Sequence, residues 1–173
     1  MENEGLIKRI ELFLEDENWD KAIDYCERVL DEDPECAKAY LYELLAELKV
    51  TTKDELKNCA QPFDDLNSCK KASRFDSSLA EELGNYNEFI RNRNEISHKE
   101  QQYETSKHLM YDNSVSSYEK AICGFETIID WKDSKEKIEE CKNKIEELNE
   151  SAKRLEEERK LREEENRVIK AKK

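Results

Sequence analysis

Glycine, proline and histidine are scarce in this chain. Its 173 residues include three Gly, two Pro and two His. Tight β-hairpins depend on glycine and proline-type turns, so this composition argues against a β protein. No apolar run approaches the roughly 20 residues that span a bilayer, and no signal peptide is recognisable at the start. We expect a nearly all-helical, cytoplasmic protein.

The usual signatures of catalysis and metal binding are also missing. The sequence has no glycine-rich phosphate loop, no GxSxG and no HExxH. His98 and His108 are too far apart for metal ligation at i and i+4. The six cysteines form no CxxC pair, and Cys26 and Cys141 fall on apolar stripes, as buried cysteines in a reducing compartment do. We expect no enzyme, cofactor or metal site, and a reactive thiol at Cys59 or Cys123 is disfavoured.

Charge is abundant but unevenly distributed. Charged residues make up 42% of the chain, and the net charge is −13. Residues 151–173 carry nine Lys or Arg against six Glu, a net charge of +3, so residues 1–150 carry −16. An acidic chain lacks the positive potential that nucleic acid or an anionic membrane requires. The expected partner is therefore a protein or peptide, possibly a basic one.

The clearest single element is an amphipathic helix over residues 19–34. Its apolar residues recur at three- and four-residue steps and share one face: Trp19, Ala22, Ile23, Cys26, Val29 and Leu30. Asp33-Pro34 ends this helix and starts the next one, because proline restricts the residue before it and suits the first helical position. Apolar helices over 5–15 and 34–50 flank it, which predicts stacked antiparallel helix pairs.

The residue pattern in the middle of the chain predicts a connector followed by one long helix. Thr52 and Glu55 form a capping box for a short helix, Phe63 and Leu66 anchor a loop over 61–67, and a further short helix covers 68–74. A long element follows, with an apolar stripe at Leu79, Leu83, Tyr86, Phe89, Ile90 and Ile96. Gly84 marks the expected crossing of another helix. The stripe lapses over 97–102, and one long or bent helix is favoured over two helices meeting near 98 because neither Gly nor Pro interrupts it.

Two helices complete the chain. Capping boxes begin at Ser116 and at Asp133. The last helix carries a two-per-seven apolar seam typical of coiled-coil packing: Ile138, Cys141, Ile145, Leu148, Ala152 and Leu155. The expected organisation is a helical domain over 1–150, made of 1–50, 51–76 and 77–150, with an exposed charged helical tail over 151–173. A chain that stops inside a charged helix leaves open whether it is a piece of a longer protein.

The opening helix has an internal counterpart. Trp19-Asp-Lys-Ala22-Ile23 aligns with Tyr118-Glu-Lys-Ala121-Ile122, and the later apolar steps of the two helices align as well. Residues 18–34 resemble the second helix of a tetratricopeptide repeat, with Ala22 and Pro34 at its two most telling positions. Leu6 and Phe13 match apolar positions of the first helix of that repeat, whereas Arg9, Ile10 and Cys26 depart from it.

The second copy, over 118–141, is degenerate. Its junction, Asp130-Trp131-Lys132-Asp133-Ser134, is similar to one in degenerate repeats of uncharacterised bacterial proteins. The resemblance implies an all-α fold of antiparallel helix pairs with the right-handed arrangement of such repeats and a long C-terminal helix. It also implies a protein-binding scaffold without cofactor or catalysis.

The resemblance places a binding surface on the first helix of the pair. The matching positions combine carboxylates with apolar side chains: Glu4, Ile7, Glu11, Leu14 and Glu15. Such a surface would suit a basic amphipathic peptide, although these positions could also be buried or idle. Trp131 is either a binding hot spot or, as we favour, a plug at a helix corner.

The competing hypothesis is structural. The seam of the last helix could pair with its own copy and make the chain an oligomerisation element. The residues expected at that interface are Ile138, Ile145, Leu148 and Leu155.

Overall fold

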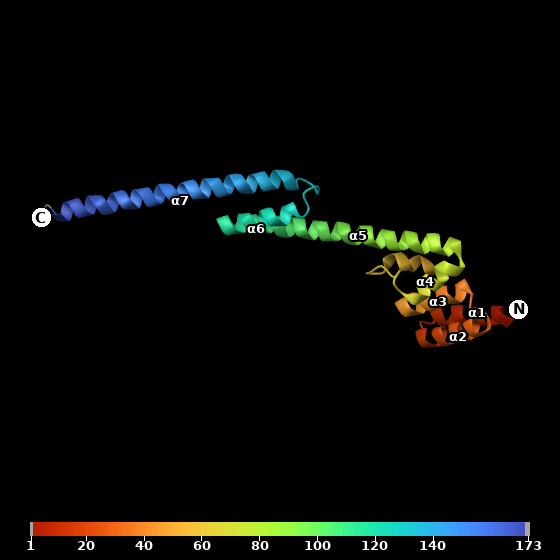
Figure 1. Cartoon of the computed structure of the whole chain (residues 1–173). Coiled ribbons are helices and arrows are strands. Elements are labelled where there is room, and N and C mark those ends of the chain that lie inside the picture. The colour runs from red at the N-terminus through yellow and green to blue at the C-terminus, as the bar shows by residue number, and fades with distance from the viewer. Residues whose placement is uncertain (1, 172–173) are drawn as a thin grey trace. The chain divides into compact units, whose positions relative to one another are not determined.

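The computed structural model describes residues 2–171 and shows an all-α chain (Figure 1). The elements follow in the order α1 (Glu2–Glu15), α2 (Trp19–Glu32), α3 (Ala37–Leu48), η1 (Lys53–Asn58), α4 (Asn67–Phe75), α5 (Ser77–Leu109), η2 (Met110–Asp112), α6 (Val115–Glu126) and α7 (Ser134–Ala171), where η denotes a 3-10 helix. The predicted all-α class and long C-terminal helix are confirmed.

The chain divides within α5 into two compact units. The first ends at Glu95 and the second begins at Ile96. This boundary does not appear in the sequence-based division, because the helix continues through it without a break. Each unit has its own apolar core and is described by itself.

The first unit is built from sequential antiparallel helices, with α1 on α2, α2 on α3 and α3 on α4. Ala22, Cys26 and Val29 of α2 are completely buried, as their shared face predicts. The helix α3 supplies much of the core because it contacts helices on two sides.

The turn after α2 is longer than predicted. The helix α3 begins at Ala37 and not at Pro34. The Asp33 carboxylate accepts a hydrogen bond from the Glu35 backbone N–H at 3.2 Å, and the Tyr40 hydroxyl donates to the Pro34 carbonyl at 3.1 Å. These side-chain bonds replace helical ones, so the helix starts only after them.

The connector is fixed to α5 by hydrogen bonds. Phe63 is buried as predicted, and its backbone N–H donates to the Asn87 side-chain oxygen at 2.7 Å. Arg93 and Asn94 donate to connector carbonyls. The predicted capping box is wrong in detail. Glu55 accepts from the N–H and the hydroxyl of Thr51, and Thr52 forms no side-chain cap.

The long helix α5 is a single element, which confirms the preferred prediction. Its apolar stripe is less continuous than predicted, because Phe89 and Ile96 are 53% and 54% exposed. The predicted helix crossing at Gly84 is also wrong for this chain. A Cβ built on Gly84 meets nothing within 4 Å.

The second unit packs α6 against α7 and against the end of α5. Its close helix approach lies at Gly124, where an added Cβ would lie 2.0 Å from the Ser106 hydroxyl oxygen. The N-cap of α6 is Ser114 and not the predicted Ser116, since the Ser114 hydroxyl accepts from the Ser117 N–H at 3.2 Å. The Tyr103 hydroxyl donates to Asp133 at 2.6 Å and ties α5 to the start of α7.

The helix α7 changes character along its length. Ile138 and Cys141 are buried, Ile145 and Leu148 are half-buried against the same core, and Leu155 is 67% exposed. Beyond Leu155 almost every described side chain of α7 is exposed. No helix in the described part of the chain has an apolar stretch that could cross a membrane.

Candidate functional site

The first unit has a groove of about 440 Å³, and part of the predicted binding surface on α1 lines it. Glu11, Leu14 and Glu15 of α1 line one side. The other side consists of Lys38, Leu41, Tyr42 and Leu45 of α3, with residues 51–53 at the end. The fold therefore brings three of the five predicted α1 residues together with α3 residues that the sequence did not single out.

Glu11 is engaged within the protein. Its carboxylate accepts hydrogen bonds from the Tyr42 hydroxyl and from the Lys38 ammonium, the latter at 3.0 Å. These hydrogen bonds hold the pKa of Glu11 below its usual value, and the bond from Tyr42 has the larger effect. Burial and the bond to Glu11 raise the pKa of Tyr42 to about 12. Glu11 thus fastens α1 to α3 and is a poor choice for capturing a new cation.

The remaining charges of the groove are mostly paired too. Lys53 forms an ion pair with Glu82 at 2.6 Å, and Lys38 is already bound to Glu11. Among the described residues, Glu15 has no ion pair. The groove is therefore weakly acidic, and its free charge lies at Glu15.

The other predicted α1 residues fall in different environments. Leu14 is almost completely buried, so it forms the base of the groove and not an accessible contact. Ile7 is half-buried, and Glu4 is exposed one to two turns before the groove. Neither of them lines the groove.

Trp131 lies in the turn before α7 and packs against the second core. Its indole nitrogen is buried, and the Lys99 ammonium lies 5.8 Å from the ring centroid. The ring is half-buried against this core.

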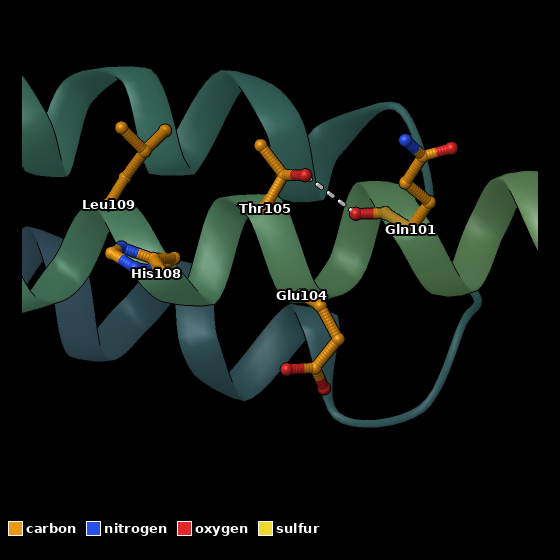
Figure 2. A pocket seen from close by; sticks show the side chains of 5 residues that line it. All are labelled: Gln101, Glu104, Thr105, His108 and Leu109. Carbon is orange, nitrogen blue, oxygen red and sulfur yellow. Dashed lines mark hydrogen bonds between the residues drawn. The ribbon is translucent and has the colours of Figure 1, made fainter.

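A second hollow, of about 460 Å³, follows the end of α5 (Figure 2). Figure 2 shows that its side chains diverge, since Glu104 points away from Thr105 and Leu109. Thr105 donates to the carbonyl of Gln101 at 2.8 Å, and His108 stacks edge-on with Tyr111. These groups do not converge on a common point, as a catalytic site requires. Within residues 2–171, no three His, Cys, Asp or Glu side chains gather as metal ligands would.

A third hollow was missed by the sequence reasoning. It lies between α4 and the start of α5 and has a volume of about 460 Å³. Lys70, Arg74 and Arg91 are among its lining residues. Their shared placement could not be read from the sequence, because it depends on how α4 packs beside α5.

Comparisons with known proteins identify no relative. No family model matches the chain, and no curated protein or solved structure matches it.

Proposed function

We propose that this protein is a non-enzymatic interaction module of the tetratricopeptide type, which binds a segment of a partner protein in the groove between α1 and α3. The supporting observation is that groove itself, which combines an apolar base at Leu14, Leu41 and Leu45 with polar edges. In helical repeats, stacked helices offer such concave surfaces to extended or helical segments.

The chemistry of the groove narrows the expected partner. An apolar side chain of the partner would cover the base, and a Lys or Arg would reach the free carboxylate of Glu15. The rest of the groove is electrically balanced by its own ion pairs. A segment with one basic residue beside apolar ones fits this groove better than a highly basic segment.

Peptide display on the immobilised full chain tests this proposal. The affinity of an enriched peptide is measured by fluorescence anisotropy for the native chain and for Glu15→Lys. An exposed pair contributes about 0.2–1 kcal/mol, so reversing its sign should weaken binding by roughly two- to tenfold and reduce the salt dependence.

The matched control is Asp24→Lys, which reverses an exposed charge on α2 outside the groove. Its binding should equal that of the native chain. If Glu15→Lys and Asp24→Lys bind the peptide equally well, the groove is not the binding surface. Glu11 is left unchanged because its replacement would disturb the contact between α1 and α3.

The alternative is self-association through the α7 seam. Most of the apolar residues of that seam are covered by their own chain in the folded second unit. Of the four residues expected at that interface, Ile138 is buried, Ile145 and Leu148 pack against the core of their own chain, and Leu155 alone is exposed. An interface of this kind would have to centre on Leu155 and the tail beyond it.

A further inference from the structure

The two compact units share a single helix, α5, and this helix is uncovered where one unit ends and the other begins. Four consecutive residues at this boundary are exposed: Glu95, Ile96, Ser97 and His98. Four residues make more than one turn of an α-helix, so no face of the helix is packed there. Ile96 is 54% exposed although it is apolar. We call residues 95–98 the bridge.

The contacts that hold α5 to each unit stop on either side of the bridge. In the first unit, the Asn94 side chain donates a hydrogen bond to the carbonyl of Ala60 at 2.8 Å. In the second unit, Glu100 forms an ion pair with Lys132 at 2.5 Å. The side chains of the last two bridge residues form no hydrogen bond or ion pair within residues 2–171.

The sequence around the bridge gives the helix little support of its own. Five of the seven residues over 92–98 rank low in helix propensity: Asn92, Asn94, Ile96, Ser97 and His98. Glu95 and Lys99 stand four residues apart, and an ion pair at this spacing adds little to an exposed helix. The segment contains neither Gly nor Pro, so it is helical, but neither propensity nor packing stabilises it strongly.

The exposed tail of α7 shows what a helix needs in the absence of packing. Residues 156–165 consist entirely of good helix formers, namely Glu, Lys, Arg and Leu. Arg159 pairs with Glu156 at 2.7 Å and with Glu163 at 3.2 Å along the helix. The bridge is as exposed as this tail but has far fewer good helix formers, so its composition and not its exposure alone makes it weak.

We propose that the bridge is a hinge, at which α5 opens locally and lets the two units reorient as independent bodies. Most helical stability in proteins comes from the packing of an apolar face, and segments with few buried contacts open most readily. Hinges are usually a few residues that absorb the change in backbone angles, and the bridge has that length. The hinge does not depend on what the α1–α3 groove binds.

The first test is amide hydrogen exchange of the full chain, followed by NMR and corrected for intrinsic exchange rates. The amides of Ile96, Ser97 and His98 should exchange about tenfold faster than those of Ile90 and Ser106, which are buried in the two units. The reason is that local opening exposes the bridge amides, whereas the buried positions exchange only when a unit unfolds. Bridge amides that are as protected as the buried positions overturn the proposal.

The second test measures how the units tumble. Backbone ¹⁵N relaxation of the full chain should require two separate diffusion tensors, one for each unit, because a hinge uncouples their rotation. Relaxation data from both units that fit one common tensor overturn the proposal, even if the bridge amides exchange quickly, because local opening would then leave the units coupled.

A variant that strengthens the helix tests the physical cause. Asn92→Ala, Ser97→Ala and His98→Ala, combined in one chain, should slow exchange of the bridge amides by about tenfold and bring the two tensors together. All three positions are exposed, so the substitutions leave both cores intact. The matched control is Asn85→Ala, at an exposed position of α5 outside the bridge, which should leave bridge exchange unchanged. A combined variant that exchanges and tumbles like the native chain rejects weak helix propensity as the basis of the hinge.

Discussion

The helices α2 and α6 carry the same sequence pattern and bury the same positions, yet they meet their neighbours differently. Ala22 and Ala121 are both fully buried, as are Cys26 and the corresponding Phe125. The difference lies at Tyr25 and its counterpart Gly124. The Tyr25 ring meets Phe13 edge-on, with centroids 5.1 Å apart, whereas Gly124 admits Ser106 into close contact.

This comparison shows how one pattern can serve two kinds of packing. In the first unit an aromatic pair fills the space between α1 and α2, and small core residues such as Cys26 suffice. In the second unit the missing side chain at Gly124 brings α5 close, and Phe125 fills the core beside it, 5.6 Å from the Tyr103 ring centroid. A helix that approaches its neighbour closely at a glycine, and a helix that is held apart by a large side chain, can therefore both fill their cores, as dense packing requires.

The largest expected difference between the two units follows from core volume. Phe125→Ala should destabilise the second unit by about 3–5 kcal/mol, because it leaves a large cavity, and Cys26→Ala should destabilise the first by only about 1 kcal/mol. The chain has two tryptophans, Trp19 in the first unit and Trp131 in the second. Urea unfolding followed by fluorescence in Trp19→Phe and Trp131→Phe backgrounds reports each unit separately. Equal losses for the two substitutions would contradict the comparison.

The two glycines sharpen the comparison because the same substitution should have opposite effects. Gly124→Ala should destabilise the second unit by about 1–2 kcal/mol, since the new methyl group collides with Ser106. Gly84→Ala should stabilise the first unit by about 0.5–1 kcal/mol, since alanine favours the helix and the site is open. The same fluorescence assay measures both, and a destabilised Gly84→Ala would show that Gly84 does pack against the chain.

The smallest expected effects concern a bond common to both units, from a tyrosine hydroxyl to a carboxylate. Tyr42→Phe and Tyr103→Phe should each cost about 0.5–1 kcal/mol at neutral pH, discounted for the partial exposure of Glu11 and Asp133. Tyr42→Phe should cost less, because Glu11 keeps Lys38 as a second partner. Unfolding of each variant beside the native chain measures these costs.

The pH dependence of these bonds has a definite sign. Hydrogen bonding lowers the pKa of Glu11 and Asp133, and the pKa of Tyr42 and of Tyr103 is raised to about 12. Lowered carboxyl pKa values stabilise the fold above the unfolded values and lose that effect as pH falls through the folded ones. Raised tyrosine pKa values stabilise the fold below the unfolded value near 10, and this stabilisation is lost as the pH rises toward 12.

The cost of each Tyr→Phe change should therefore be constant between roughly pH 5 and 10 and shrink outside that window. A cost that stays the same at acid pH would show that the carboxylate is not involved.

Much of the fold follows from local patterns. The helix faces of α2, α6 and the start of α7 were predictable because burial of a periodic apolar face is a property of the segment itself. The unbroken α5 was predictable for the same reason, since neither glycine nor proline interrupts its middle. Helix starts were less predictable. At Pro34 and at Ser114, side-chain bonds to the turn decided which residue begins the helix.

The same distinction between local pattern and tertiary contact applies to the candidate sites. The sequence by itself determined the helices, the paired pattern and the α1 face with Glu11, Leu14 and Glu15. The tertiary structure decided that Leu14 is buried, that Glu11 is bound to Tyr42 and Lys38, and that the close helix approach falls at Gly124 and not at Gly84. The physical reason is that periodicity fixes which side of a helix faces inward, whereas the partner that a side chain meets depends on neighbouring helices distant in the chain.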